Sequence, residues 1–134
     1  MTRLGQTIPA LPARDVAAAL DFYRDRLGFE VAYQVAGFAI VRRDDAVIHL
    51  WQADDEAWRG REVGAAPVCS GAESFIAGTA SCRIAVEGID PLFDELARAD
   101  VLHPVSKDGV IDTDHGTREI NALDCDGNLL TFFE

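Results

Sequence analysis

The chain is poor in basic residues and has no long apolar run. Twelve Lys and Arg stand against 23 Asp and Glu, which gives a formal net charge of −11. Nucleic-acid phosphates need a basic surface, so this balance argues against a nucleic-acid partner. No stretch approaches the roughly 18 apolar residues of a membrane span, and the N-terminus lacks the apolar core of a secretory signal. We therefore expect a cytoplasmic protein that does not bind membranes.

Cysteine is scarce, and the short motifs of common catalytic sites are missing. Cys69, Cys82 and Cys125 form no Cys-x-x-Cys pair and are odd in number. In a reducing compartment we interpret them as buried small apolar side chains, with Cys69, in a loop, the most exposed. The sequence has no Gly-rich phosphate loop, no Gly-x-Ser-x-Gly elbow and no Cys/His nucleophilic pattern. It therefore offers no obvious catalytic machinery.

What the chain does contain is an internal repeat. Residues 44–51 (Asp-Asp-Ala-Val-Ile-His-Leu-Trp) are echoed by residues 126–133 (Asp-Gly-Asn-Leu-Leu-Thr-Phe-Phe), an acidic turn followed by an alternating strand in each case. A short amphipathic helix precedes each copy, at 16–27 and 91–99. Such a repeat indicates two copies of one supersecondary unit, and neither copy can bury its apolar face alone. At 134 residues the two copies form one domain, and the groove between them is the expected ligand site.

The residue pattern predicts β-α-β-β-β in each unit. The first unit spans about 5–53, the second spans 80–134, and 54–79 is a Gly-, Ala- and Ser-rich linker or lid. Asp15 and Asp90 are the expected helix caps, Gly28 ends the first helix, and Asp44-Asp45 makes a tight turn. The expected strands are 6–11, 29–35, 38–42 and 47–53, then 82–86, 102–105, 117–123 and 129–133.

Several segments resemble the bleomycin-resistance proteins. They are 8–11 (Ile-Pro-Ala-Leu), 13–16 (Ala-Arg-Asp-Val), Phe22-Tyr23, 26–29 (Arg-Leu-Gly-Phe), 37–39 (Gly-Phe-Ala) and 124–129 (Asp-Cys-Asp-Gly-Asn-Leu). That family belongs to the vicinal oxygen chelate superfamily, with glyoxalase I, fosfomycin-resistance enzymes and extradiol dioxygenases. The resemblance implies an α+β fold of two βαβββ modules in tandem, whose curved mixed sheets surround a cavity. It also implies a homodimer that exchanges N-terminal strands, with Pro9 at the matching position.

The superfamily's enzymes hold a divalent metal at four strand positions. By resemblance these positions are Ile8, His49, Ser81 and Thr131 here, and His49 alone is a good ligand. A metal site commonly needs three good protein ligands, so we expect no metal and no cofactor. An alternative set, His49 with His115 and Glu119, would form if the loop before Thr117 folded over the cavity. A metal-dependent lyase, transferase or dioxygenase is therefore the alternative function.

The resemblance and the strand alternation together predict the cavity lining. Phe38 matches an aromatic residue that stacks on the drug in bleomycin binders. Alternation places Trp51 beside His49 and turns Glu119 and Asn121 toward the groove. His115 stands before Gly116, where bleomycin binders carry a Trp; it offers less stacking area and, if protonated, would repel a cation. The predicted ligand-binding residues are Phe38, His49, Trp51, His115, Glu119 and Asn121.

These residues predict a protein that binds a small molecule and does not transform it. An aromatic, acid-lined groove at a dimer interface would take up a flat cationic antibiotic, and the surplus acid would either aid its capture or serve solubility. Blander interpretations stay open: core packing for Phe38 and Trp51, a surface carboxylate for Glu119, an edge-strand break for Pro9. A third possibility is a module that serves another protein, with its cavity filled by Phe38, Trp51 and Phe133.

Overall fold

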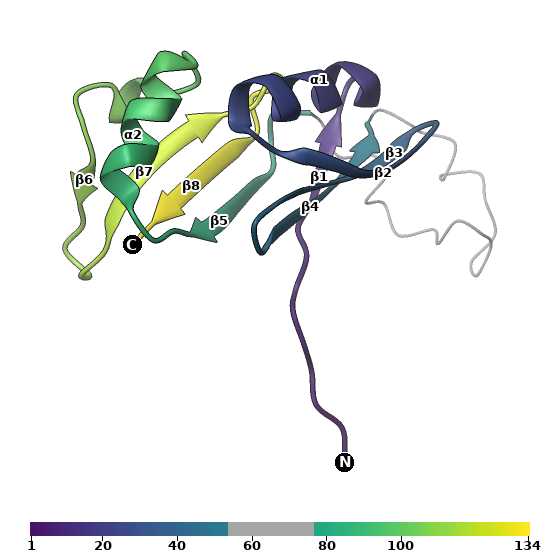
Figure 1. The fold of residues 1–134 in the computed structure, drawn as a ribbon, viewed down its shortest axis with the longest axis horizontal. Helices are drawn as coiled ribbons and strands as arrows, with labels where there is room; N and C mark the ends of the chain where they lie inside the picture. The colour runs from purple at the N-terminus through teal and green to yellow at the C-terminus, as the bar shows by residue number, and fades with distance from the viewer. Residues whose placement is uncertain (54–76) are drawn as a thin grey trace.

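The computed structural model describes residues 1–53 and 77–134, and Figure 1 shows their arrangement. In this part of the chain, eight strands form two four-stranded mixed sheets with one α-helix beside each. The predicted α+β fold of two tandem modules is confirmed. Most of the expected linker at 54–79 lies outside the described residues, so the module boundaries stay a prediction.

The first sheet holds β1 (Ala10–Ala13), β2 (Glu30–Val35), β3 (Phe38–Arg43) and β4 (Ala46–Gln52). Its order is β1-β4-β3-β2, with β1 parallel to β4 and the other neighbours antiparallel. Helix α1 (Val16–Leu27) packs on one face. Ile48 and Leu50 of β4 are buried on that helix side, because alternate residues of a strand point to the same face of the sheet.

The second sheet repeats this plan with β5 (Ser81–Ala85), β6 (Ile111–Asp112), β7 (Arg118–Leu123) and β8 (Leu129–Phe133). Its order is β5-β8-β7-β6, and β5 runs parallel to β8. Helix α2 (Ile89–Arg98) packs on one face, and a 3-10 turn, η3 (Pro104–Ser106), lies before β6. The buried side chains Ile120, Leu130 and Phe132 extend the core beneath α2.

The ends of α1 follow the sequence signals, whereas the start of α2 does not. The Asp15 carboxylate accepts the backbone N–H groups of Ala17 and Ala18 at 3.0 and 3.3 Å, and Gly28 ends the helix at a φ of 72°. The prediction that Asp90 caps α2 is wrong, because the helix begins at Ile89 after Gly88. The Asp90 carboxylate instead accepts two hydrogen bonds from Arg118, at 2.8 and 3.0 Å.

Two predicted strands are wrong in extent. The expected strand 102–105 is reduced to a single bridge at Leu102, because Pro104 has no N–H and the His103 ring accepts the N–H of Val105 at 3.0 Å, which turns the chain into η3. The expected strand 6–11 begins only at Ala10, after Pro9.

The cysteine prediction also needs correction. Cys82 on β5 is half-buried, and Cys125 is exposed in the turn before β8. Cys125 lies at a turn rather than within a strand, so no sheet face covers it. Cys69 lies outside the described residues.

A buried polar cluster joins the two modules. The Tyr23 hydroxyl of α1 donates to Oδ2 of Asp124 at 2.9 Å, and Nδ2 of Asn128 donates to the carbonyl of Pro12 at 2.8 Å. Burial and the neighbouring Asp124 carboxylate raise the pKa of Tyr23 well above its ordinary value, so it stays a hydrogen-bond donor. These bonds, made between residues more than 100 positions apart, hold one module against the other.

The first eight residues form an extended arm. Every one of them is exposed, and Figure 1 shows this segment running away from the two sheets. The arm joins the fold where the carbonyl of Pro9 accepts the N–H of His49 at 3.0 Å. Among residues 1–53 and 77–134, no helix is long and apolar enough to cross a membrane.

Candidate functional site

The first sheet presents a face of aromatic rings on the side away from α1. Phe38 and Trp51 are paired across β3 and β4, and Ile40 is paired with His49. The Phe38 ring lies 5.2 Å from the His49 ring at 87°, and 6.2 Å from the Tyr33 ring. We call Tyr33, Phe38, His49 and Trp51 the aromatic face.

The aromatic face is partly open to solvent. Phe38, His49 and Trp51 are half-buried, while Tyr33 on the edge strand β2 is 51% exposed. Val35, paired with Phe38, is 46% exposed and extends the apolar surface along β2. Phe38 and Trp51 are therefore not in the buried core, and an exposed apolar face of this kind is typical of a binding surface.

The open face of the second sheet is polar and internally paired. Glu119 of β7 is 8% exposed, and its Oε1 accepts hydrogen bonds from Nη2 of Arg83 at 2.5 Å and from Oγ1 of Thr117 at 3.0 Å. Beside it, the Thr131 hydroxyl donates to Oδ1 of Asn121 at 2.8 Å. Together with Phe133, these residues are the polar face: Arg83, Thr117, Glu119, Asn121, Thr131 and Phe133.

Glu119 is held in its charged form. Its hydrogen bond with Arg83, followed by that with Thr117, lowers the pKa of the carboxyl below its ordinary value, against the opposing effect of desolvation. The interpretation of Glu119 as a solvated surface carboxylate is wrong, since the side chain is buried and paired.

His115 lies at the edge of the polar face. Its Nε2 is 3.2 Å from Oγ1 of Thr117 and 3.6 Å from Oε1 of Glu119, and the side chain is 62% exposed. The structure thus brings His115 and Glu119 together, with Asn121 two positions along the same strand face. Phe38, His49 and Trp51 lie on the other sheet, so the six predicted residues fall into two groups of three.

Two residues of the polar face escaped the sequence analysis. Arg83 reaches across β8 to Glu119, and its guanidinium lies 4.7 Å from the centre of the Phe133 ring. Thr117 bonds to both His115 and Glu119. The alternation of side chains along β5 would have predicted that Arg83 lies on the open face. Its ion pair with Glu119 depends on the order of the strands in the sheet, and no local sequence signal gives that order.

The family metal positions lie in different surroundings in this structure. Ile8 has no donor atom and lies in the exposed arm, while the Thr131 hydroxyl is engaged with Asn121. His49 packs edge-on against Phe38 in the first sheet, apart from His115 and Glu119 in the second. Across the described parts of the chain, no three His, Cys, Asp or Glu side chains gather closely enough to hold a metal ion.

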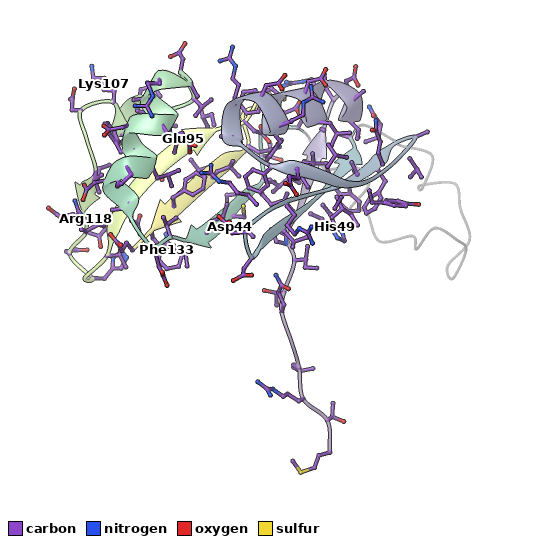
Figure 2. The ribbon with its side chains drawn as sticks, in the orientation of Figure 1. Asp44, His49, Glu95, Lys107, Arg118 and Phe133 are labelled. Carbon is purple, nitrogen blue, oxygen red and sulfur yellow. The ribbon has the colours of Figure 1, made fainter. Side chains whose placement is uncertain are left out.

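A cleft of about 690 Å³ between the modules does not contain the predicted ligand-binding residues. It is lined by the β3–β4 turn, β5 and α2, including Arg43, Asp44 and Glu95. Figure 2 labels Asp44 and Glu95 near the middle of the molecule, with His49 and Phe133 on different sheets. The predicted residues of the two faces therefore do not line this cleft.

Comparisons with known proteins agree with the fold and the repeat. Residues 3–132 match the model of the Glyoxalase/Bleomycin resistance protein/Dioxygenase superfamily. A bleomycin resistance protein of Geobacillus stearothermophilus is 46% identical over 129 residues, 96% of each chain, and the same figures hold for one of Staphylococcus aureus.

Solved structures show the same relationship. A bleomycin-binding protein from bleomycin-producing Streptomyces verticillus, complexed with copper(II)-bleomycin, is 28% identical with a TM-score of 0.73, over 98% of this chain and 97% of the other. A lactoylglutathione lyase from Agrobacterium tumefaciens shares the fold at 17% identity and a TM-score of 0.74, over 99% and 96%. On this evidence, the chain belongs to the glyoxalase/bleomycin resistance protein/dioxygenase superfamily.

Proposed function

We propose that this chain binds a bleomycin-type antibiotic stoichiometrically and protects by sequestering the drug without transforming it. The observation that carries the proposal is the 46% identity, over 96% of both chains, with proteins named bleomycin resistance proteins. The structural match to a protein complexed with copper(II)-bleomycin supports the same ligand class. Such a protein would act in the cytoplasm, where it meets the drug before the drug reaches its target.

The aromatic face suits a flat ligand. A planar group stacked against the Phe38 ring gains about 0.5–1.5 kcal/mol beyond the burial of its area. His49 and Trp51 would widen this platform, since they flank Phe38 on β4. On the polar face, Glu119, Asn121 and His115 would anchor polar groups of the ligand. The net charge of −11 would favour capture of a cation, an effect that salt weakens.

The two faces would meet in a homodimer. They lie on different sheets of one chain. In a two-fold dimer, when one surface of the first copy contacts a second surface of its partner, the partner makes the same contact in return. The aromatic face of one copy would thus lie opposite the polar face of its partner. The exposed arm 1–8 contacts its own chain through a 3.4 Å hydrogen bond from Gln6 to the carbonyl of Asp45, and in the dimer it would cross to the second copy and exchange.

Calorimetric titration of the purified chain with copper-loaded and metal-free bleomycin tests the proposal. We expect saturable binding with one drug per chain, and mass spectrometry of the released drug should show an unchanged molecule. No binding heat would refute the ligand. A modified drug, produced in molar excess over the protein and lost on treatment with a chelator, would favour the metal-dependent enzyme instead.

A further inference from the structure

Arg83 lies across the middle of the polar face. It belongs to the edge strand β5 and is paired with Thr131 of β8, but its guanidinium contacts Glu119 on β7, the next strand along. On the way it covers the Phe133 ring, 4.7 Å from the ring centre. Arg83 therefore occupies both the carboxylate and the ring that this face could offer to a ligand.

The two partners of this ion pair differ in exposure. The Arg83 side chain is 51% exposed, whereas that of Glu119 is 11% exposed. Oε1 of Glu119 faces Arg83, Thr117 and His115. The exposed partner can move into solvent at little cost, because a long, flexible side chain regains hydration and rotamer freedom there. The buried carboxylate has no such freedom: when Arg83 leaves, it keeps the hydrogen bond from Thr117 but lacks a positively charged partner.

This asymmetry makes Arg83 an exchangeable counter-ion. Resting on the proposed function, we propose that Arg83 determines the charge selectivity of the polar face: it covers Glu119 in the free protein and is displaced by the cationic group of the ligand. The incoming cation replaces the hydrogen bond that Arg83 donates to Glu119, and the departing guanidinium uncovers the Phe133 ring. A ligand with an anionic group gains nothing from Glu119 and instead keeps Arg83 in place.

Substitution of Arg83 by Met separates charge from packing. Met retains an apolar stem over Phe133 but leaves Glu119 without its counter-ion. Two bleomycin-type ligands that share a scaffold, one ending in a cation and one in a carboxylate, are titrated into wild type, Arg83→Met and Arg83→Lys. In Arg83→Met we expect the cationic ligand to bind roughly tenfold tighter, the scale of one charge-assisted hydrogen bond, and the carboxylate ligand to bind weaker. Arg83→Lys keeps the charge and should stay near wild type.

Other results would overturn the inference. Weaker binding of the cationic ligand by Arg83→Met would make Arg83 a direct ligand contact. An equal change for both ligands, or no change, would show that Arg83 does not select charge. If wild type binds neither ligand, the proposed function fails separately.

A second measurement needs no ligand. The carboxyl carbon of Glu119 is followed by NMR as the pH is varied in the free wild-type and Arg83→Met proteins. We expect the pKa of Glu119 to rise in Arg83→Met, because its counter-ion is gone. An unchanged pKa would overturn the inference whatever the ligand results, since Arg83 would then not hold Glu119 in solution.

Discussion

The two modules share one topology but present different open faces. On β4 and β8 the positions turned toward the helices stay large and apolar, with Ile48 and Leu50 in one copy and Leu130 and Phe132 in the other. The alternate positions differ: Val47, His49 and Trp51 in the first copy, and Leu129, Thr131 and Phe133 in the second. Packing against a helix requires apolar side chains on one side of each strand. The side chains on the other side can differ between the two copies and can carry functional groups.

The first copy offers ring faces and the second offers a carboxylate, an amide and a guanidinium. Phe38 and His49 contact each other through ring packing alone, whereas Glu119 is tied to Arg83 and Thr117 by hydrogen bonds. A ligand with a flat part and a charged part needs both faces. The aromatic face has no carboxylate, and the one ring of the polar face, Phe133, is covered by Arg83 in the free protein. This is the physical reason to expect two copies of the chain at one site.

Removal of residues 1–8 tests that expectation most severely. If the arm joins two copies, the truncated chain should sediment as a monomer, and each aromatic face should lose its polar counterpart. Loss of about 3 kcal/mol of contact would weaken bleomycin binding roughly a hundredfold. Analytical ultracentrifugation and calorimetry measure the two effects on one sample.

The truncated chain should still fold, because residues 1–8 are exposed and contribute little to the core. A circular dichroism spectrum like that of the full chain is the control. A truncated monomer that binds the drug as well as the full chain would show that one copy holds a complete site. The comparison of the two faces would then lose its functional meaning.

Phe38→Ala tests the aromatic face alone. Loss of a stacked ring should weaken binding by about 1–2 kcal/mol, roughly tenfold in Kd. The free energy of unfolding should fall by less, because Phe38 is only half-buried.

Ile48→Ala is the matched control on the opposite side of the same sheet. Its side chain is 1% exposed, so its truncation should cost about 2–5 kcal/mol of stability and leave the affinity of the folded protein unchanged. If Phe38→Ala instead lost stability and kept its affinity, while Ile48→Ala lost affinity, Phe38 would be a core residue.

The helix-facing half of this pattern was readable from the sequence, because local signals determine it. Val16–Leu27 was predicted to the residue from an Asp cap and a Gly stop, and Leu129–Phe133 from its alternation. The predicted start of α2 was wrong because the Asp90 side chain forms an ion pair with Arg118, 28 positions away, and does not cap the helix. Local capping rules cannot account for such a competitor.

The open faces were only partly readable, for the same reason. Alternation turned Glu119 and Asn121 away from the helix, but nothing near Glu119 in the sequence points to Arg83, 36 residues earlier. Strand order brings them together, since β8 lies between β5 and β7. The residue with the strongest control over the charge of the polar face was therefore the one that the sequence analysis missed.

The smallest expected effect is a difference between the two faces in how much stability they contribute as the pH falls. Glu119 has a lowered pKa in the folded protein, so its ion pair adds stability above the ordinary pKa of a Glu, and this contribution is lost as the pH falls through the lowered value. Urea unfolding between about pH 6 and pH 3 should therefore show a steeper loss of stability for wild type than for Glu119→Gln. Arg83→Met, which removes the other partner of the ion pair, should reduce the dependence of stability on pH similarly. Phe38→Ala should keep the wild-type dependence. Equal slopes in all four proteins would mean that the polar face is not held by charge, and its contrast with the aromatic face would rest on shape alone.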